Sequence, residues 1–283
     1  MKIIIIGSNG QVGMNLSSVL NEHDLILATH NDVEIKNKRS VFSLIKNHKP
    51  HVVINTAAFH NVEKCEKNHV KAFRVNAIGA KYLALACSMV DAVLLHISTD
   101  YVFDGKKKTP YDEDDIPNPL NTYGITKLAG EYYIRGILKK YFIVRTSGLY
   151  GKYKCRAKGG NFVERMIFLA QNKGNVKVVD DEILTPTYTF DLSLQIKKLI
   201  ETNFYGTYHI TNNGFCSWYE FAKRIFELKN ICVNLESAKS KEFAPKVKRP
   251  LYSVLENKKL KSLNMDIMPM WDDALKRFLK GEN

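Results

Sequence analysis

The sequence predicts an α/β protein with a doubly wound parallel sheet and a smaller C-terminal lobe. Short apolar runs alternate with longer amphipathic runs through the first half of the chain. A glycine-rich turn joins the first apolar run to the first helical pattern, and the alternation becomes irregular after about residue 150. Strands that alternate with helices imply a parallel sheet with helices on both faces.

The individual elements follow from the hydrophobic periodicity. We expect strands at 2–6, 25–29, 52–55, 93–97 and 142–145, and helices at about 11–22, 39–48, 68–90 and 122–139. Further helices are expected at 162–171 and 218–228, between short strands. We therefore predict one domain over residues 1–150 and a lobe over 151–283, some segments of which return to the main domain.

Composition excludes several classes of protein. The 283 residues are 45% hydrophobic and 25% charged, which is ordinary for a globular chain. The net charge of +13 comes from lysines scattered among acids, so it predicts a solvated surface or an anionic small-molecule partner and no nucleic-acid module. No segment avoids charge for the roughly 18 residues of a membrane span, and the N-terminal apolar run is too short for a signal peptide.

The cysteines indicate a cytoplasmic protein with reduced thiols. They are odd in number, widely spaced, and form neither a C-x-x-C pair nor a metal-ligand pattern with histidine. They are Cys65, Cys87, Cys155, Cys216 and Cys232.

The glycine-rich turn predicts a dinucleotide site. Residues 2–6 run directly into the turn, and a helical pattern begins at once. Glycines allow a tight turn and close approach of the backbone to a pyrophosphate, which the helix N-terminus attracts. An ordinary strand-to-helix turn is the alternative, but the position at the first βα junction favours a Rossmann-type site. The predicted contacts are Gly7, Asn9, Gly10, Gln11, Val12 and Gly13.

The ends of the second and third strands complete this prediction. No acid stands directly at the end of the second strand, where His30 lies, and the cations Lys36, Lys38 and Arg39 follow within a few residues. A 2′-phosphate would not be repelled there, so NADPH is favoured, with NADH as the alternative. The third strand ends in residues suited to a flat cofactor, and we expect contacts from Asn55, Ala57 and Ala58.

A candidate catalytic group combines Thr99, Tyr123 and Lys127. Thr99 closes the fourth strand, and Tyr123 and Lys127 are four apart in the next helix, so they share a face. A lysine beside a tyrosine lowers the pKa of the phenol, which can then give a proton to a carbonyl oxygen. We also expect Tyr123 and Lys127 to contact the cofactor. A tyrosine and a lysine four residues apart also occur elsewhere in this chain, and such pairs usually lie on a helix surface. The catalytic prediction therefore depends on the position of Tyr123 and Lys127 after the fourth strand.

Longer motifs run along the whole chain. They are residues 7–13, Ser98-Thr99-Asp100-Tyr101-Val102-Phe103-Asp104-Gly105, residues 123–131, Arg145-Thr146-Ser147, residues 160–163, 185–187 and 217–222, and Lys248-Arg249-Pro250. Together they resemble the extended short-chain dehydrogenases, and within them the dTDP-4-dehydrorhamnose reductase family. The resemblance covers nearly the whole chain, and the eight-residue run from Ser98 is its most specific part.

The resemblance implies reduction of the 4-keto group of dTDP-4-dehydro-L-rhamnose to dTDP-L-rhamnose, with Thr99, Tyr123 and Lys127 as the matching triad. Asn161 and Arg249 match positions that would hold the nucleotide diphosphate, and a guanidinium binds phosphate oxygens in a bidentate fork. A solvated charge in a basic run is the alternative for Arg249. The substrate contacts implied are Val62, Thr99, Asp100, Tyr101, Asn161 and Arg249.

Two positions depart from the family pattern. Gly148 stands where a tryptophan is frequent, which removes a stacking surface near the sugar, and His60 replaces a threonine. We assign the aromatic residues Phe162, Trp218 and Phe221 to packing.

Other functions remain open from the residues alone. A regulatory subunit resembling the β subunit of methionine adenosyltransferase would keep the fold without catalysis, and a nucleotide-sugar epimerase would share the triad. No metal motif is present, although the acidic loop 112–115 contains carboxylates that could bind a cation between subunits. The sequence is compatible with a homodimer.

Overall fold

The computed structural model describes residues 1–153, 160–243 and 246–282, so Lys154, Cys155 and Gly159 lie outside the described residues. The four described cysteines are free thiols. Within the described ranges no helix has the length and apolar character needed to cross a bilayer.

The central sheet confirms the predicted doubly wound α/β fold. Its six strands are parallel and lie in the order β10-β5-β4-β3-β1-β2. All five predicted strands agree with the structure to within two residues at each end, and the largest difference is in the fourth, which was predicted at 93–97 and ends at Thr99. The strands are β1 (Lys2–Ile6), β2 (Asp24–Ala28), β3 (Val52–Asn55), β4 (Val93–Thr99), β5 (Tyr141–Thr146) and β10 (Gly206–His209).

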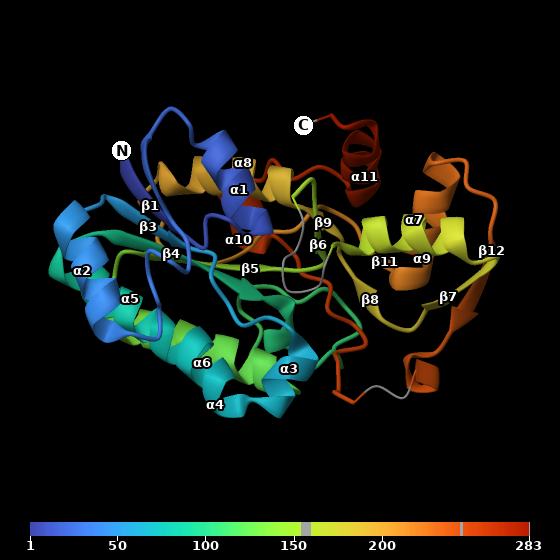
Figure 1. Ribbon diagram of the computed structural model, residues 1–283, viewed down its shortest axis with the longest axis horizontal. Coiled ribbons are helices and arrows are strands. Elements are labelled where there is room, and N and C mark those ends of the chain that lie inside the picture. The colour runs from blue at the N-terminus through green and yellow to red at the C-terminus, as the bar shows by residue number, and fades with distance from the viewer. Residues whose placement is uncertain (154–159, 244–245, 283) are drawn as a thin grey trace.

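Helices cover both faces of this sheet (Figure 1). One layer holds α1 (Gln11–Val19) and α8 (Thr189–Ile200), and the other holds α2 (Lys38–His48), α5 (Gly79–Met89) and α6 (Thr122–Ile137). Successive side chains of a strand point to opposite faces. Ile3 and Ile5 therefore pack into the α1/α8 layer, while Ile4 and Ile6 pack with α2 and α5.

The predicted helix at 68–90 is interrupted. It consists of α4 (His69–Phe73), a π-helical turn (Arg74–Ile78) and α5. Asn76 in the π turn bonds both the N–H and the carbonyl of Phe59 and donates to Thr126 Oγ1 of α6 at 3.0 Å. The irregular turn thus ties the loop after β3 to α6, which periodicity alone does not predict. The short α3 (Val62–Lys67) was also not predicted.

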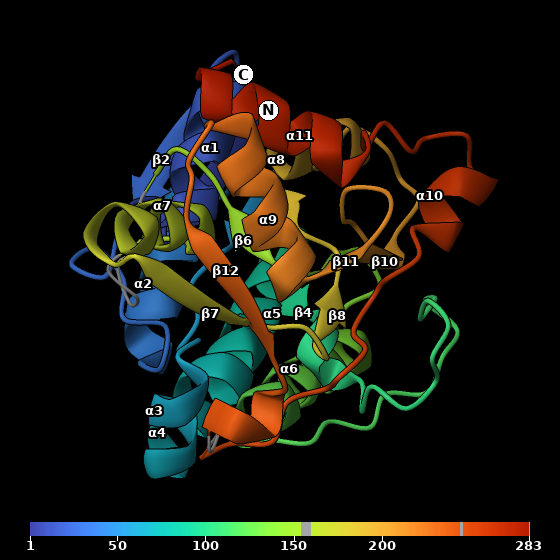
Figure 2. The ribbon, with the colours of Figure 1, turned by 90° about the vertical axis from the view of Figure 1, so that its right-hand side faces the viewer.

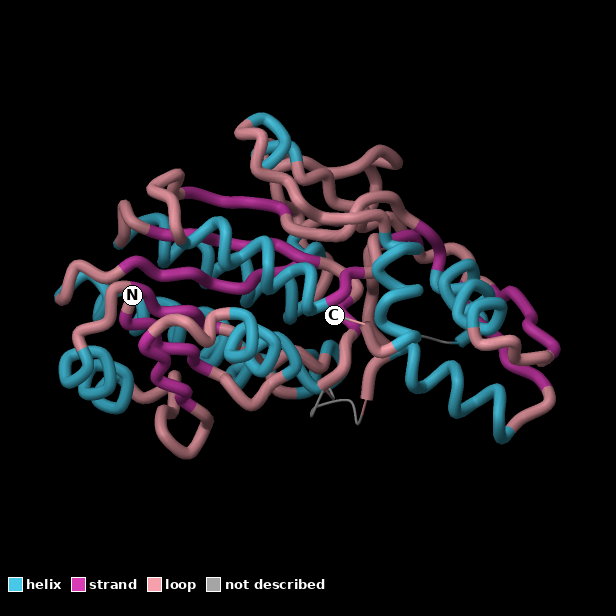
Figure 3. The backbone as a smooth tube through the Cα atoms, turned by 90° about the horizontal axis from the view of Figure 1, so that it is seen from above, coloured by secondary structure: helices cyan, strands magenta, loops and turns pink. Residues whose placement is uncertain are grey.

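The second half builds a lobe beside the sheet (Figures 2 and 3). Its core lies among α7 (Phe162–Asn172), α9 (Trp218–Leu228) and the parallel pair β7 (Asn175–Val179) and β12 (Asn234–Ala238). Two segments from this half, α8 and β10, belong to the layers of the main sheet. The remaining elements are β6 (Leu149–Tyr150), β8 (Ile183–Leu184), β9 (Thr187–Tyr188), β11 (Cys216–Ser217), α10 (Lys258–Ser262) and α11 (Trp271–Lys280).

A buried ion pair joins α6 to the sheet. Glu131 of α6 is fully buried, and its carboxylate accepts from Arg145 Nη2 of β5 at 2.7 Å and Nε at 3.0 Å. Ser98 Oγ of β4 donates to the same carboxylate at 2.5 Å. A buried charge is tolerated only when it is paired and hydrogen-bonded. The pair therefore sets the position of α6 against β4 and β5.

Replacing Arg145 tests this constraint. We expect Arg145→Ala to lower the free energy of unfolding by about 3–5 kcal/mol, because the Glu131 carboxylate stays buried without its main partner. Lys140→Ala, which removes the exposed pair with Asp91 at 2.7 Å, should cost at most about 1 kcal/mol. Urea denaturation of both variants checks the difference, and equal costs would contradict it.

Candidate active site

The carboxyl edge of the sheet has a crossing point between β1 and β3. The chain adds β2 on one side of β1 and then places β3 on the other side. Loops leaving the two strands diverge there, and ligands of doubly wound sheets bind in the resulting crevice. The glycine turn after β1 and the loop after β3 meet at this point.

Two glycines of the turn are required by contact with neighbouring backbone. Gly7 has φ +78°, and a Cβ on it would lie 3.0 Å from the backbone nitrogen of Ala57 and 2.8 Å from Thr56 Oγ1. A Cβ on Gly13 would lie 2.4 Å from the Gly7 carbonyl oxygen. The turn therefore packs directly against the loop after β3 and the first turn of α1, as the dinucleotide prediction requires.

The N-terminus of α1 suits an anion. Its N-cap, Gly10, offers no side-chain hydrogen bond to the first turn, so the terminal N–H groups of the helix remain for a ligand. Gln11 Nε2 is buried and has no hydrogen-bond partner among the described residues. The side chain of Val12 is in the core, so only its backbone can face a ligand. These features fit a dinucleotide pyrophosphate.

The predicted contacts at the neighbouring strand ends differ in character. The His30 side chain is 79% exposed, with Nε2 at 3.5 Å from Glu34 Oε2, and Lys36 Nζ lies 3.2 Å from the same atom. Asn55 is buried, and its Oδ1 accepts from the Ala57 N–H at 3.1 Å. Ala58 is half-buried in the loop that follows.

Tyr123 and Thr99 are brought together by a close approach of α6 to the turn after β4. A Cβ on Gly124 would lie 2.1 Å from the Tyr101 carbonyl oxygen, so only glycine allows this packing. Asn121 caps the helix by accepting from the Gly124 N–H at 2.9 Å. The Tyr123 side chain lies beside Thr99, close enough for Thr99 to affect the pKa of the phenol, as the predicted pairing of these two residues requires.

Lys127 has its hydrogen-bond partners on β4. Its Nζ donates to the Ile97 carbonyl at 2.6 Å and lies 2.9 Å from His96 Nε2. Burial raises the pKa of Tyr123, and the neighbouring Thr99 side chain opposes that rise only in part. The expectation that Lys127 lowers the pKa of the phenol stays a prediction, because the hydrogen-bond partners of Lys127 Nζ lie on β4 and not at Tyr123.

Asp100 supports Thr99 from behind. Thr99 Oγ1 donates to Asp100 Oδ1 at 2.9 Å, and Ser147 Oγ donates to Oδ2 at 2.8 Å. Burial raises the pKa of Asp100, although hydrogen bonds from Ser253, Ser147 and Thr99 lower it in part. The carboxyl is 5% exposed and engaged within the protein, so it orients Thr99. Direct contact of Asp100 with substrate stays a prediction.

A second polar group, from the lobe side, faces the loop after β3. Arg249 Nη2 pairs with Glu63 of α3, and its Nε is buried without a partner among the described atoms. Tyr101 and Glu182 lie within electrostatic reach of the guanidinium. Arg249 is thus a partly buried, oriented cation, which argues against the alternative of a solvated charge.

The other predicted substrate contacts have structural partners. Asn161 caps α7 in a capping box with Glu164, and its Nδ2 donates to the Gly151 carbonyl at 2.9 Å, which leaves one amide hydrogen. Val62 begins α3 and is buried. Contact of these residues with a nucleotide sugar stays a prediction.

The departure at Gly148 has a conformational reason. Its φ is +56°, and a Cβ would lie 2.8 Å from both Leu184 Cδ1 and the Thr185 carbonyl oxygen. A tryptophan does not fit this position without rearrangement of the chain.

Sequence reasoning missed His96, Glu182, Ser147 and Ser253. A histidine inside the apolar run of β4 was a usable signal, since buried strands rarely carry an unpaired polar group. Glu182 lies near Trp218, which lowers the pKa of its carboxyl in part. Trp218 was assigned to packing, and its ring centroid lies 4.4 Å from that of Phe162. Glu182 and Ser253 come from loops, where no period distinguishes functional positions.

The acidic loop 112–115 is neutralised by lysines. Lys258 Nζ lies 3.1 Å from Asp112 and 2.7 Å from Asp114, and Lys107 bonds Asp115 at 2.5 Å. These ammonium groups occupy the places that a cation would take.

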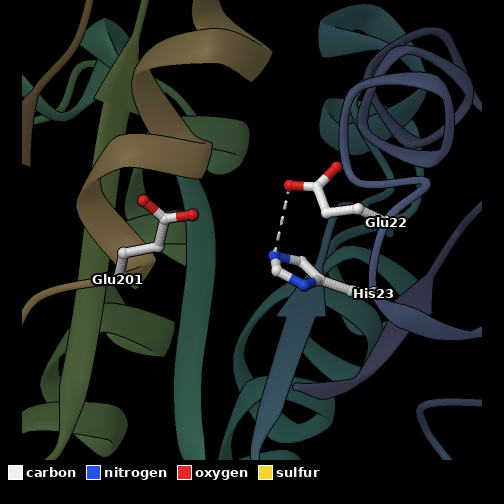
Figure 4. Close-up of side chains that lie close together, drawn as sticks. All are labelled: Glu22, His23 and Glu201. Atoms are coloured by element: carbon white, nitrogen blue, oxygen red, sulfur yellow. Dashed lines mark ion pairs between the residues drawn. The ribbon is translucent and has the colours of Figure 1, made fainter.

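One other group of potential metal ligands lies at the opposite edge of the sheet. Glu22 and His23 precede β2, and Glu201 follows α8 (Figure 4). The two carboxylates are exposed, and Glu22 already pairs with Lys197. The described contacts therefore explain this cluster without an ion.

Comparison with known proteins agrees with this geometry. The model of the RmlD substrate binding domain matches residues 1–283. Spore coat polysaccharide biosynthesis protein SpsK of Bacillus subtilis (strain 168) is 40% identical over 282 residues, covering 99% of this chain and 97% of that protein. dTDP-4-dehydrorhamnose reductase of Aggregatibacter actinomycetemcomitans is 37% identical, with 97% of each chain covered.

A solved structure extends the similarity to three dimensions. The crystal structure of dTDP-4-dehydrorhamnose reductase from Bacillus anthracis str. Ames in complex with NADP superposes with a TM-score of 0.95, at 42% identity and 99% coverage of both chains. Full-length agreement in sequence and fold, together with the Thr99–Tyr123 pair at the sheet edge, establishes that this chain belongs to the dTDP-4-dehydrorhamnose reductase family.

Proposed function

We propose that the protein is an NADPH-dependent reductase that converts the 4-keto group of dTDP-4-dehydro-L-rhamnose to the alcohol of dTDP-L-rhamnose. The observation that carries this proposal is the proximity of Thr99 and Tyr123 at the same edge of the sheet as the glycine turn. The relatives named dTDP-4-dehydrorhamnose reductase support the same reaction. A cytoplasmic location and a homodimer remain predictions from the sequence.

The cofactor prediction rests on fit. NADPH supplies the hydride when it is bound. The α1 N-terminus would hold its pyrophosphate, and the exposed groups after β2 leave room for a 2′-phosphate beside Lys36. The similar Bacillus anthracis structure is a complex with NADP.

The residues at the sheet edge divide the remaining work. Tyr123 would donate a proton to the keto oxygen, and Thr99, oriented by Asp100, would hold the Tyr123 hydroxyl in place. A cationic Lys127 on the same helix face would stabilise the negative charge that develops on the phenol. Arg249 would bind the diphosphate.

Removal of the Tyr123 hydroxyl tests the reaction. We expect Tyr123→Phe to lower kcat for NADPH oxidation with dTDP-4-dehydro-L-rhamnose by about 10²–10⁴-fold, because the general acid is lost. Tyr132→Phe, on the exposed side of the same helix, is the matched control and should keep wild-type activity. Absorbance of the reduced nicotinamide, followed with NADPH and then NADH, also tests the coenzyme preference.

Two wild-type outcomes would point elsewhere. Conversion of a nucleotide sugar without net coenzyme oxidation would indicate an epimerase. Coenzyme binding without turnover of this or related keto sugars would favour a regulatory subunit.

The activity should fall in alkaline solution. Burial lowers the pKa of Lys127 to about 8, while Glu131 raises it in part. Lys127 is therefore an ammonium below about pH 8 and a neutral amine above it. We expect kcat/KM to fall as the pH rises through this value, since the positive charge near Tyr123 is lost. A pH–rate profile with constant kcat/KM across this range would contradict the role given to Lys127.

Arg249 should act on binding more than on turnover. We expect Arg249→Met to raise the KM of the dTDP sugar about tenfold or more, with kcat little changed, because a charge-assisted hydrogen bond to phosphate is lost. Lys246→Met removes an exposed charge from the same basic run and should leave KM within about twofold of wild type. Equal effects of the two variants would show that only the net charge matters.

A further inference from the structure

Three buried polar side chains form a row beneath the catalytic edge. Asn55 comes from β3, His96 from β4 and Lys127 from α6, and each is 1% exposed. Asn55 Nδ2 lies 2.9 Å from His96 Nδ1, and His96 Nε2 lies 2.9 Å from Lys127 Nζ. Both ring nitrogens of His96 are thus in hydrogen bonds, and the position of the ring proton determines which atom donates in each bond.

The amide of Asn55 determines the role of His96 Nδ1. Asn55 Oδ1 accepts from the backbone N–H of Ala57 at 3.1 Å. A flipped amide would place two donors against each other there, so the oxygen must face Ala57 and the NH₂ group must face His96. Nδ1 therefore accepts a hydrogen bond and carries no proton.

The ring is neutral, so its single proton is on the other nitrogen. Burial, together with the nearby Lys127, holds the pKa of His96 well below its usual range. A neutral imidazole has one N–H, and with Nδ1 as acceptor this group is Nε2–H. An N–H donor therefore points at Lys127 Nζ. An ammonium has three donors and no lone pair, whereas a neutral amine can accept this bond.

We propose that His96 is a positioning residue that presents its Nε2–H to Lys127, favours the neutral amine, and so sets the upper pH at which the site works. Lys127 then accepts from His96 and donates one N–H to the Ile97 carbonyl at 2.6 Å. Its second N–H remains for the cofactor side. Asn55 acts one step further back, by determining the tautomer of His96.

The groups around Lys127 both raise and lower its pKa. On α6, Glu131 favours the ammonium, but its carboxylate is shared with Arg145 from β5, Arg135 from α6 and the Ser98 hydroxyl from β4. Tyr123 precedes Lys127 by one turn of the same helix. Asn55, the group that faces the row from β3, does not titrate. The depressed pKa of Lys127 agrees with a site in which its positive charge is only partly compensated.

The tautomer can be observed without activity. The protein labelled with ¹⁵N-histidine should show, at a pH of about 9, a His96 ring with its proton on Nε2 and a bare Nδ1. The signal is assigned by its loss in His96→Gln. A proton on Nδ1, or a doubly protonated ring, would overturn the proposal.

Changing the acceptor tests the cause. In Asn55→Asp the amide donor becomes a carboxylate, which accepts from Nδ1–H, so the ring proton should move to Nδ1. Asn121→Asp places a new carboxylate at the cap of α6 instead and should leave the proton on Nε2. A His96 ring unchanged in Asn55→Asp would also overturn the proposal.

The kinetic arm rests on the proposed function. In His96→Gln the side-chain oxygen can turn to accept from the ammonium, so the alkaline fall of kcat/KM should move up by about one pH unit or more. His209→Gln replaces another buried histidine, one that bonds the Tyr111 carbonyl, and should leave the fall in place. If kcat/KM of an active, folded His96→Gln enzyme falls at the same pH as in the wild type, the proposal is contradicted. If the wild type is inactive, only the proposed reductase function is contradicted, and the NMR result then decides the proposal for His96.

Discussion

The buried pair of Glu131 and Arg145 holds the helix on which the candidate chemistry depends. Tyr123, Lys127 and Glu131 are spaced four residues apart on α6, so they lie on one face of the helix. At Glu131, on the C-terminal side of Lys127, this face is anchored to β4 and β5 through the Glu131 carboxylate. In the first turn of the helix, Gly124 allows close packing against the Tyr101 carbonyl, which brings Tyr123 near Thr99. A desolvated charge tolerates little displacement from its partners, so the Glu131–Arg145 pair limits the movement of Tyr123 and Lys127 on the same helix.

Lys127, between these two ends, is in a place where an ammonium is only partly stabilised. Its neighbours are a carbonyl, a neutral histidine and a glutamate that is already paired with arginine. A fully compensated lysine would stay charged at every physiological pH and would bond too firmly to its partners to serve a ligand. Burial with incomplete compensation instead brings its titration close to the working range of an enzyme.

The site combines segments that are distant in the sequence. Arg249 and Ser253 reach Glu63 and Asp100 from the last part of the chain, and Gly148 makes a tight bend where family members often have an aromatic ring. The substrate side is thus built from loops whose placement depends on the packing of the lobe against the sheet.

The sequence by itself determined the parallel sheet and the glycine turn, because periodicity and βα junctions are local properties of the chain, and it predicted the group of Thr99, Tyr123 and Lys127. It did not predict α8 or β10, since the alternation that marks the first half is lost after residue 150, nor the π turn at Asn76. Only the tertiary structure decided that Lys127 turns toward His96, that Asp100 orients Thr99, and that Arg249 pairs with Glu63. Each of these contacts joins separate elements of the fold. The protonation states of the side chains involved depend on their burial, which no local sequence pattern encodes.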